Sequence, residues 1–390
     1  MVMEATKKKN RTPFFAQPAV QTLMASLFCV LFGLVLGFIV LLIIQPGTNP
    51  ETGSLYAWEA IMAIIKNFFK FSNHASRVKN FGNTLVKTAP LLMCSLSVLF
   101  AYKVGLFNIG AAGQYVVGAG ASLYLALGLQ LPWYVCLLAA AVAGAVWGAI
   151  SGVLKAYRHV NEVISCIMLN WIGLYAVNSL LNSVKDPASP YTLKIKENAA
   201  SSVLPSLGLT KLFPGNKYVT LAIPLAILFA VLVWVVLSKT KFGYELKATG
   251  LNKNAAKYCG MKEKRNIILT MAIAGALAGI GAGMLYLTGY EEWSCTQASV
   301  PAMGFNGIAA AFLGGLHPIG SIFSAFFIQH ITSGGAYVDK TMYCSQISDF
   351  ISAVIIYSCG FVLFIKQNAQ RIRNRRIERS LQLTKGGEAA

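Results

Sequence analysis

A small set of amides and aromatic rings, embedded in apolar sequence, has the chemistry to bind a polar solute. An amide inside an apolar helix is costly unless it bonds a neighbour or faces a polar cavity, so each one needs a reason. One reason is a substrate path, along which amides exchange hydrogen bonds with the solute and aromatic rings stack on it. The candidates are Phe107, Asn108, Gln114, Asn170, Trp171, Tyr175, Asn178 and Asn306. Hydrogen bonding between helices is an equally weighted alternative for any single asparagine.

Two glycine-rich stretches indicate breaks in the helices that carry these residues. They read GLFNIGAAGQY (105–115) and GFNGIAAAFLGGLHPIG (304–320). Non-helical backbone at membrane depth survives only where protein or water satisfies its polar groups, so a break favours a position beside the path. The alternative is a tight turn with ordinary helix-packing glycines. His317 is interpreted as a solvated turn residue in preference to a proton site, and Glu162 as a helix-start charge.

The sequence carries no sign of an enzyme. It has no Gly-Lys-Ser/Thr phosphate loop, and no acid stands paired with a nucleophile. The eight cysteines and four histidines show no metal-ligand spacing, so we expect no metal and no cofactor in this chain. Free, buried cysteines are the favoured state, with a bridge between Cys295 and Cys344 as the minor alternative.

Composition places the chain in a membrane. It has 390 residues, of which 56% are hydrophobic and 12% charged, whereas a soluble chain holds about 25% charged residues. Several apolar runs reach the roughly 20 residues that cross a bilayer. The net charge of +19 does not indicate nucleic acid, because the basic residues fall in short loops and tails, as the positive-inside rule predicts. We therefore expect membrane lipids, and not nucleic acid, to surround the chain.

We predict an all-α fold of about ten crossings, with both termini in the cytoplasm. The domains are a cytoplasmic tail (1–22), a transmembrane domain (23–366) and a basic cytoplasmic tail (367–390). The predicted crossings are 23–44, 84–101, 115–129, 133–154, 163–181, 218–237, 267–287, 301–316, 318–332 and 347–365. The segment Leu55–Phe71 carries three charges and is expected to lie in the membrane interface. A re-entrant pair is the alternative for the two pieces that flank His317.

The order of the crossings indicates an inverted repeat. Spans 2–5 and spans 7–10 each cover about 100 residues and run in opposite directions through the membrane. Each block is expected to contain an interruption after its first helix, at 105–113 and at 304–320. Inverted repeats with matched broken helices are typical of transporters, and the binding path lies where the breaks meet.

A polar island at 239–266 separates two apolar runs. It holds eight basic residues against two acidic ones, which predicts a cytoplasmic position. Tyr244–Thr249 and Asn254–Tyr258 each suit a short helix, and Gly250 and Gly260 are expected to punctuate them. Two short helices at the membrane face would form a docking surface.

Four stretches in this order resemble the permease subunits of ABC importers for simple sugars, nucleosides and branched-chain amino acids. Besides the two glycine-rich stretches, they are NEVISCIMLNW (161–171) and FGYELKATGLNKNAAKYCGM (242–261). The resemblance covers 89–365 and is strongest to the longer permease of two-permease purine nucleoside importers. One departure is Ala112, where relatives often have Glu, so no acidic group serves at this position.

The resemblance implies that the island carries the coupling helix that binds a separate ATPase, which in turn binds ATP and magnesium. The residues implied in coupling are Glu245, Lys247, Thr249, Gly250, Asn254, Ala255, Ala256 and Gly260. Also implied are a second permease subunit in a heterodimer, a substrate-binding lipoprotein and a bacterial cell membrane. Nucleosides, purine nucleosides first, are the implied substrate.

Three alternatives stay open. One is an importer of ribose-like sugars, since a sugar ring would suit the same aromatic residues. Another is an ion-coupled secondary carrier, which would need carboxylates or a sodium cage inside the membrane. The last is a membrane scaffold that transports nothing, which the broken-helix repeat disfavours.

Overall fold

The apolar runs of the sequence fold as helices throughout the part of the chain that the computed structural model describes. That part comprises residues 18–44 and 50–338, with isolated residues between 350 and 372. Within it, extended pairing is limited to two isolated bridges, Lys185 with Thr192 and Tyr191 with Ser294. The predicted all-α class is confirmed.

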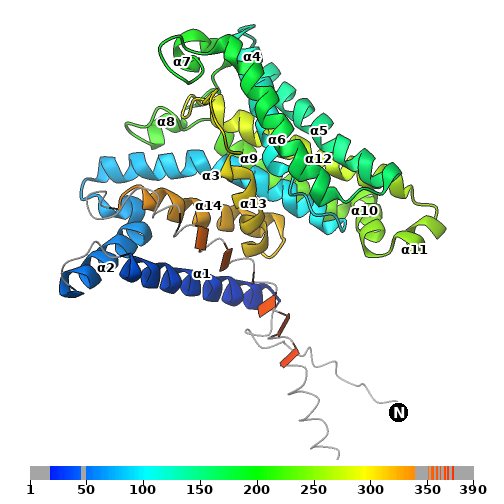
Figure 1. The fold of residues 1–390 in the computed structure, drawn as a ribbon, viewed down its shortest axis with the longest axis horizontal. Helices are drawn as coiled ribbons and strands as arrows, with labels where there is room; N and C mark the ends of the chain where they lie inside the picture. Colours follow the sequence, from blue (N-terminus) through cyan, green and yellow to red (C-terminus); the bar gives the residue numbers. More distant parts are fainter. Residues whose placement is uncertain are drawn as a thin grey trace, which may run out of the picture.

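The helices follow the predicted order along the chain (Figure 1). They are α1 (Pro18–Ile43), α2 (Pro50–Lys66), η2 (Asn67–Lys70), α3 (His74–Lys103), α4 (Ala111–Leu127), α5 (Trp133–Arg158), α6 (Glu162–Leu181), η3 (Asn182–Val184), α7 (Ile195–Asn198), η4 (Ala200–Ser202), α8 (Leu209–Leu212), α9 (Ala222–Lys239), α10 (Lys241–Leu251), α11 (Lys253–Tyr258), α12 (Glu263–Tyr286), α13 (Ala302–Leu313) and α14 (Pro318–Gly335).

Five of the described helices are long and apolar enough to cross a membrane: α3, α5, α6, α9 and α12. The protein is therefore a multi-pass α-helical membrane protein. The most apolar window of α3 is 89% buried and that of α12 is 72% buried, whereas the windows of α5, α6 and α9 are buried by a third or less. Helices α3 and α12 consequently form the centre of the bundle, whereas α5, α6 and α9 expose apolar faces on its outside.

Helices α5 and α12 pack backbone against backbone through two glycine rows. Gly144, Gly148 and Gly152 recur every four residues on α5, and Gly275 and Gly279 do so on α12. A Cβ added at Gly275 would overlap the Gly144 carbonyl, and one added at Gly279 would overlap the Ala140 carbonyl. Small residues at this spacing let membrane helices approach closely. The resulting van der Waals packing stabilises the helix pair, because the hydrophobic effect does not drive helices together within lipid.

Two expectations about the interruptions were wrong in detail. The second interruption is confined to residues 314–317, because Ala302–Leu313 forms the continuous helix α13, whose alanines and apolar side chains sustain it. The first ends at Gly110, because Ala111 already begins α4. Glycine alone did not break these helices, since close packing compensates its poor helix propensity.

Other expectations fall partly outside the described residues. The tenth crossing (347–365) and most of both tails lie there, so ten crossings and the inverted repeat stay predictions. Helix α1 begins at Pro18, five residues earlier than expected. The segment 55–70 is helical and packs closely on α14, where Gly334 touches the Ile64 backbone. Cys295 has a free thiol, and Cys344 lies outside the described residues.

Replacing Gly275 by valine should destabilise the protein, because its side chain would push α12 away from α5. Overpacking of a close contact costs about 1–3 kcal/mol, so we expect a lower unfolding midpoint in thermal melts of the detergent-solubilised protein. The control is Val146→Leu on the outer face of α5, where the side chain is 56% exposed. Equal melting of the two variants would contradict the glycine-row contact.

Candidate functional site

The break between α3 and α4, residues 104–110, is held by a pair of buried amides. Asn108 Nδ2 donates to Gln114 Oε1 at 2.8 Å and to Ser97 Oγ at 3.0 Å. Gln114 Nε2 donates back to Asn108 Oδ1 at 3.2 Å. Both side chains are almost wholly buried. The two amides therefore satisfy each other and tie the break to α3 on one side and to α4 on the other.

Asn170 of α6 supplies hydrogen bonds to the backbone on both sides of Gly110. Its Oδ1 accepts from the Gly113 N–H at 2.8 Å, and its Nδ2 donates to the Ile109 carbonyl at 3.2 Å. A Cβ at Gly113 would lie 2.5 Å from Asn170 Oδ1, so the glycine is what lets α6 come this close. Asn170 thus pairs two backbone groups, the Gly113 N–H and the Ile109 carbonyl, that an unbroken helix would pair within itself.

The break meets the beginning of α13 inside the molecule. A Cβ added at Gly304 would overlap the backbone of Ala112, which places the first turn of α13 against the first turn of α4. At 1.5 Å per residue, α4 is about 26 Å long and α13 about 18 Å, both short of the roughly 30 Å hydrocarbon layer. Two half-helices thus present their N-termini to each other, an arrangement that transporters use for substrates at mid-membrane.

The other candidate path residues lie apart from this group. Trp171 and Tyr175 sit on the outer face of α6, 43% and 59% exposed, with their rings stacked 6.2 Å apart. Asn178 holds the segment after α12, accepting from Trp293 Nε1 at 2.9 Å and donating to the Gln297 carbonyl at 2.9 Å.

Phe107 and Asn306 are half-buried, in the break and on α13. The structure therefore brings Asn108, Gln114 and Asn170 together, with Phe107 in the same break, and no hydrogen bond or ring contact joins the other four candidates to them within the described residues. Which of the eight contacts a solute stays a prediction.

The turn after α13 lies beside the end of α3. The rings of Phe312 and Tyr102 meet edge to face at 5.4 Å. His317 is exposed and precedes α14, and its partial burial, followed by the nearby Lys103, lowers its pKa. His317 lies in the turn between α13 and α14, which is where a turn residue was expected.

The island folds as two capped helices. Thr240 Oγ1 accepts from the Gly243 N–H at 3.0 Å and starts α10, and Asn252 Oδ1 accepts from the Ala255 N–H at 3.0 Å and starts α11. Such caps satisfy backbone donors that the first turn leaves unpaired. Gly260, at a φ of +78°, ends the pair as expected.

Gly250 was expected to separate the two helices, and this was wrong. It lies inside α10 and touches α3, since a Cβ there would overlap the backbone of Val104. Gly105, at a φ of +76°, lies on the other side of this contact. Next to it, Asn266 Nδ2 of α12 donates to Thr249 Oγ1 at 2.9 Å, with both side chains buried. Helix α10 is therefore fixed to both central helices, at the residue where α3 gives way to the break.

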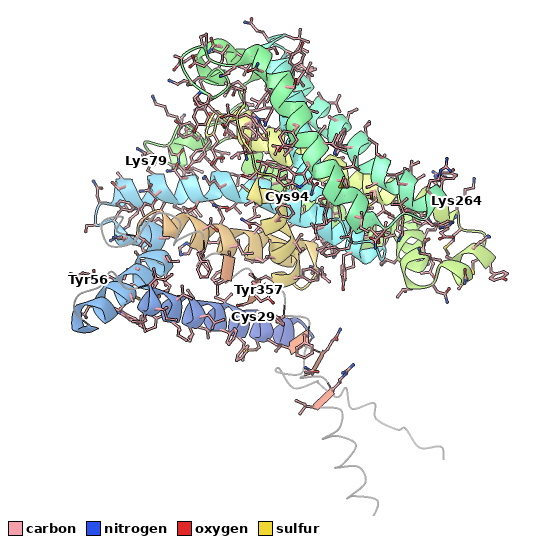
Figure 2. The ribbon with its side chains drawn as sticks, viewed as in Figure 1. Cys29, Tyr56, Lys79, Cys94, Lys264 and Tyr357 are labelled. Carbon is pink, nitrogen blue, oxygen red and sulfur yellow. The ribbon has the colours of Figure 1, made fainter. Side chains whose placement is uncertain are left out.

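The outer surface of the island is basic and carries two bare apolar side chains. Leu251 is 89% exposed and Tyr258 is 93% exposed. Among the residues implied in coupling, Asn254, Ala255 and Gly260 are exposed, Glu245, Lys247 and Gly250 are half-buried, and Thr249 and Ala256 are buried. Figure 1 shows α11 at one extreme end of the bundle, and Figure 2 places Lys264 at that end and Lys79 far from it.

Sequence reasoning missed a partly exposed ion pair between α3 and the segment after α12. Lys87, within the predicted second span, pairs with Glu291 at 2.6 Å, and its ammonium lies 5.3 Å from the Tyr290 ring. The only available signal was a lone lysine in an apolar run, which marks a functional candidate in membrane proteins. Among the described residues, no group of three or more His, Cys, Asp or Glu could hold a metal ion.

A multi-pass helical protein in which two half-helices meet, with a polar helix pair fixed to the break, has the architecture of a membrane permease. The comparison with family models agrees. Residues 80–359 match the family described as "Branched-chain amino acid transport system / permease component", and the chain belongs to this family. No solved structure is significantly similar to the chain.

Relatives of known name are similar over most of the chain. The guanosine ABC transporter permease protein NupP of Bacillus subtilis is 32% identical, covering 87% of this chain and 95% of its own length. The nucleoside ABC transporter permease protein NupB of Lactococcus lactis is 32% identical, covering 86% and 89%. A glucose ABC transporter permease protein of Haloferax volcanii is 32% identical, covering 66% and 70%.

Removing the Asn170 amide should destabilise the break. The variant Asn170→Ala leaves the Gly113 N–H and the Ile109 carbonyl unpaired in a buried position, and an unsatisfied buried group costs about 1–3 kcal/mol. We expect a lower thermal unfolding midpoint in detergent. The control is Ile172→Ala, on the exposed face of the same helix. If both variants melt alike, Asn170 does not hold the break.

Proposed function

We propose that this chain is the membrane permease subunit of an ATP-binding-cassette importer that carries nucleosides, purine nucleosides first. The observation that carries the proposal is the contact of Gly250 with Val104, which fixes the basic helix pair to the break in the transmembrane helices. The names of the guanosine and nucleoside relatives support the substrate. The energy source lies in a separate ATPase, because the sequence has no phosphate loop.

The mechanism transmits movement from α10 to the break. An ATPase seated on α10 and α11 closes around ATP and magnesium and displaces the helix pair. Helix α10 shifts the end of α3 through the Gly250 contact and the start of α12 through the Thr249–Asn266 hydrogen bond. The N-terminal turns of the two half-helices, which touch at Ala112 and Gly304, then move relative to each other. As a result the path closes on one side of the membrane and opens on the other.

The orientation follows from charge. The island and both termini lie in the cytoplasm of a bacterial cell, because 22 of the 33 basic residues fall on the segments assigned to that side. A substrate-binding lipoprotein delivers the nucleoside at the opposite face. A second, non-identical permease subunit covers the apolar outer face of α6, where Trp171 and Tyr175 are exposed.

A sugar importer is the second candidate. Similarity to a glucose permease protein favours it, and a sugar ring has polar groups that the same amides would bind. Both candidates share the ATPase, the lipoprotein and the route of force.

The substrate is tested by reconstitution. We expect the purified chain, in liposomes with its partner permease, ATPase and lipoprotein, to take up guanosine in an ATP-dependent manner. Uptake of ribose or glucose without competition by guanosine would establish the sugar importer instead. Transport by the chain alone, abolished by an ionophore, would contradict the importer altogether.

The route of force is tested at Gly250. The variant Gly250→Ala inserts a methyl group against Val104 and separates α10 from α3. We expect ATP hydrolysis to continue while nucleoside uptake falls, so that about tenfold fewer molecules are imported per ATP. The control is Ser238→Ala, an exposed residue at the end of α9. An unchanged transport ratio in both variants argues against this route.

A further inference from the structure

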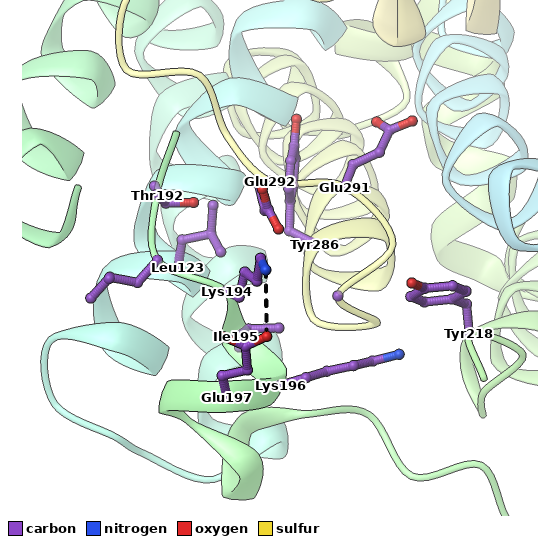
Figure 3. A pocket seen from close by; sticks show the side chains of 12 residues that line it. Leu123, Thr192, Lys194, Ile195, Lys196, Glu197, Tyr218, Tyr286, Glu291 and Glu292 are labelled. Atoms are coloured by element: carbon purple, nitrogen blue, oxygen red, sulfur yellow. Dashed lines mark hydrogen bonds and ion pairs between the residues drawn. The ribbon is translucent and has the colours of Figure 1, made fainter. Parts of the chain in front are cut away.

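A pocket of about 230 Å³ opens at the end of the bundle opposite the island (Figure 3). It lies at the end of α12, about 36 Å along that helix from Glu263 by the helical rise. Its lining residues come from α4, from the segment around α7, from Tyr218 and from the segment after α12. In the proposed orientation this pocket faces the outside of the cell.

The walls of the pocket are anchored by buried contacts. Trp293 is fully buried and receives a hydrogen bond at its carbonyl from the Thr192 N–H at 2.9 Å. Its ring donates to Asn178 of α6, and the Leu204 N–H donates to the Leu287 carbonyl at 3.0 Å. Three segments distant in sequence are thereby held together, so the pocket is a preformed feature.

Charged groups from two segments line this space. Glu291 and Glu292 come from the segment after α12, while Lys194, Lys196 and Glu197 come from the segment around α7. Glu291 is engaged by Lys87 at 2.6 Å. Lys196 lies 3.7 Å from the centre of the Tyr218 ring and donates to the Lys217 carbonyl at 3.2 Å.

Two charged groups remain available to a ligand. Glu292 is exposed and has no ion pair or hydrogen bond within the described part of the chain. Lys194 contacts only the exposed Glu197, at 3.5 Å, a type of pair that contributes little. Leu123 and Ile195 are buried and supply an apolar wall between them.

This lining fits an uncharged ring that has hydrogen-bond donors at one position and acceptors at another. A carboxylate accepts from ring N–H and amino groups, and an ammonium donates to ring nitrogen and carbonyl groups. The volume is below the 300–1,000 Å³ or so of pockets for drug-sized ligands, so it suits a single base and leaves an attached sugar in the open mouth.

We propose that this outer pocket binds the base of a purine nucleoside before translocation, with Glu292 accepting from the base and Lys194 donating to it. The inference rests on the proposed nucleoside importer and adds a substrate site at its outer face. Lys87 acts as a positioning residue, because it holds the segment that carries Glu292 against α3.

The test is equilibrium binding of radiolabelled guanosine to the assembled transporter without its lipoprotein. We expect Glu292→Gln and Lys194→Gln to bind about tenfold more weakly or worse, since each loses a charged hydrogen bond. Leu123→Trp, which fills the apolar wall, should abolish binding. The matched control is Lys211→Gln, an exposed lysine of the same outer region that does not line the pocket. In uptake assays the first two variants should raise KM and leave the maximal rate unchanged.

The outcomes separate this inference from the function it rests on. If the complete wild-type system imports guanosine but the transporter without lipoprotein binds none, the pocket is not a substrate site and the importer stands. Equal binding by wild type, Glu292→Gln and Lys194→Gln also overturns the inference, whether or not Leu123→Trp folds. If the variants weaken only the affinity for the lipoprotein, the pocket is a binding site for the lipoprotein and not for the nucleoside. Failure of wild-type uptake with all partners present overturns the importer itself.

Discussion

The structure depends on one requirement, that the backbone polar groups of the break at 104–110 find partners away from water. Unpaired groups at this depth would cost several kcal/mol each. Turn hydrogen bonds pair the N–H groups of Val104, Gly105 and Leu106 with carbonyls of α3, and the Asn170 side chain donates to the Ile109 carbonyl and accepts from the Gly113 N–H. The Asn108 and Gln114 side chains bond each other, which pairs the buried amides themselves. The requirement explains why α6 packs so closely on α4 and why glycines stand at the contact. It also explains why amides occur in segments that are otherwise apolar.

The same network limits what the break can do. Asn108 Nδ2 uses both of its donors, one to Gln114 and one to Ser97, so it has none for a solute unless a neighbour releases it. In this conformation Asn108 and Asn170 hold the structure of the break in place. Trp171 and Tyr175 show the opposite case, since about half of each side chain is exposed on the outer face of α6.

Sequence predicted much of the fold because long apolar runs leave few choices. Each of the nine segments predicted as crossings within the described residues contains a helix, although only five of these helices are long and apolar enough to cross a membrane, and the island folds as two short helices with Gly260 at their end. Local rules failed where tertiary packing decided. Gly250 and the glycines of α13 have a low helix propensity. They nevertheless lie in helices, because a neighbouring backbone occupies the space of the missing side chain.

Pairings across long sequence separations were beyond prediction. The Lys87–Glu291 ion pair joins residues about 200 positions apart, and Trp293 reaches Asn178 over 115. Neither separation leaves a periodic signal in one sequence. The candidate amides were found because polarity in an apolar run is a local feature, whereas the outer pocket is built by α4, the segment around α7, Tyr218 and the segment after α12, which only folding brings together.

The glycine rows between α5 and α12 have a mechanical consequence. A joint formed by carbonyl oxygens and glycine Cα atoms has no rotamers, so it cannot absorb strain by changing side-chain conformation. The two helices must therefore tilt or translate together, as a stiff strut spanning the full thickness of the protein. Any relative sliding during a working cycle has to occur at other contacts, where longer side chains interdigitate and can re-pack.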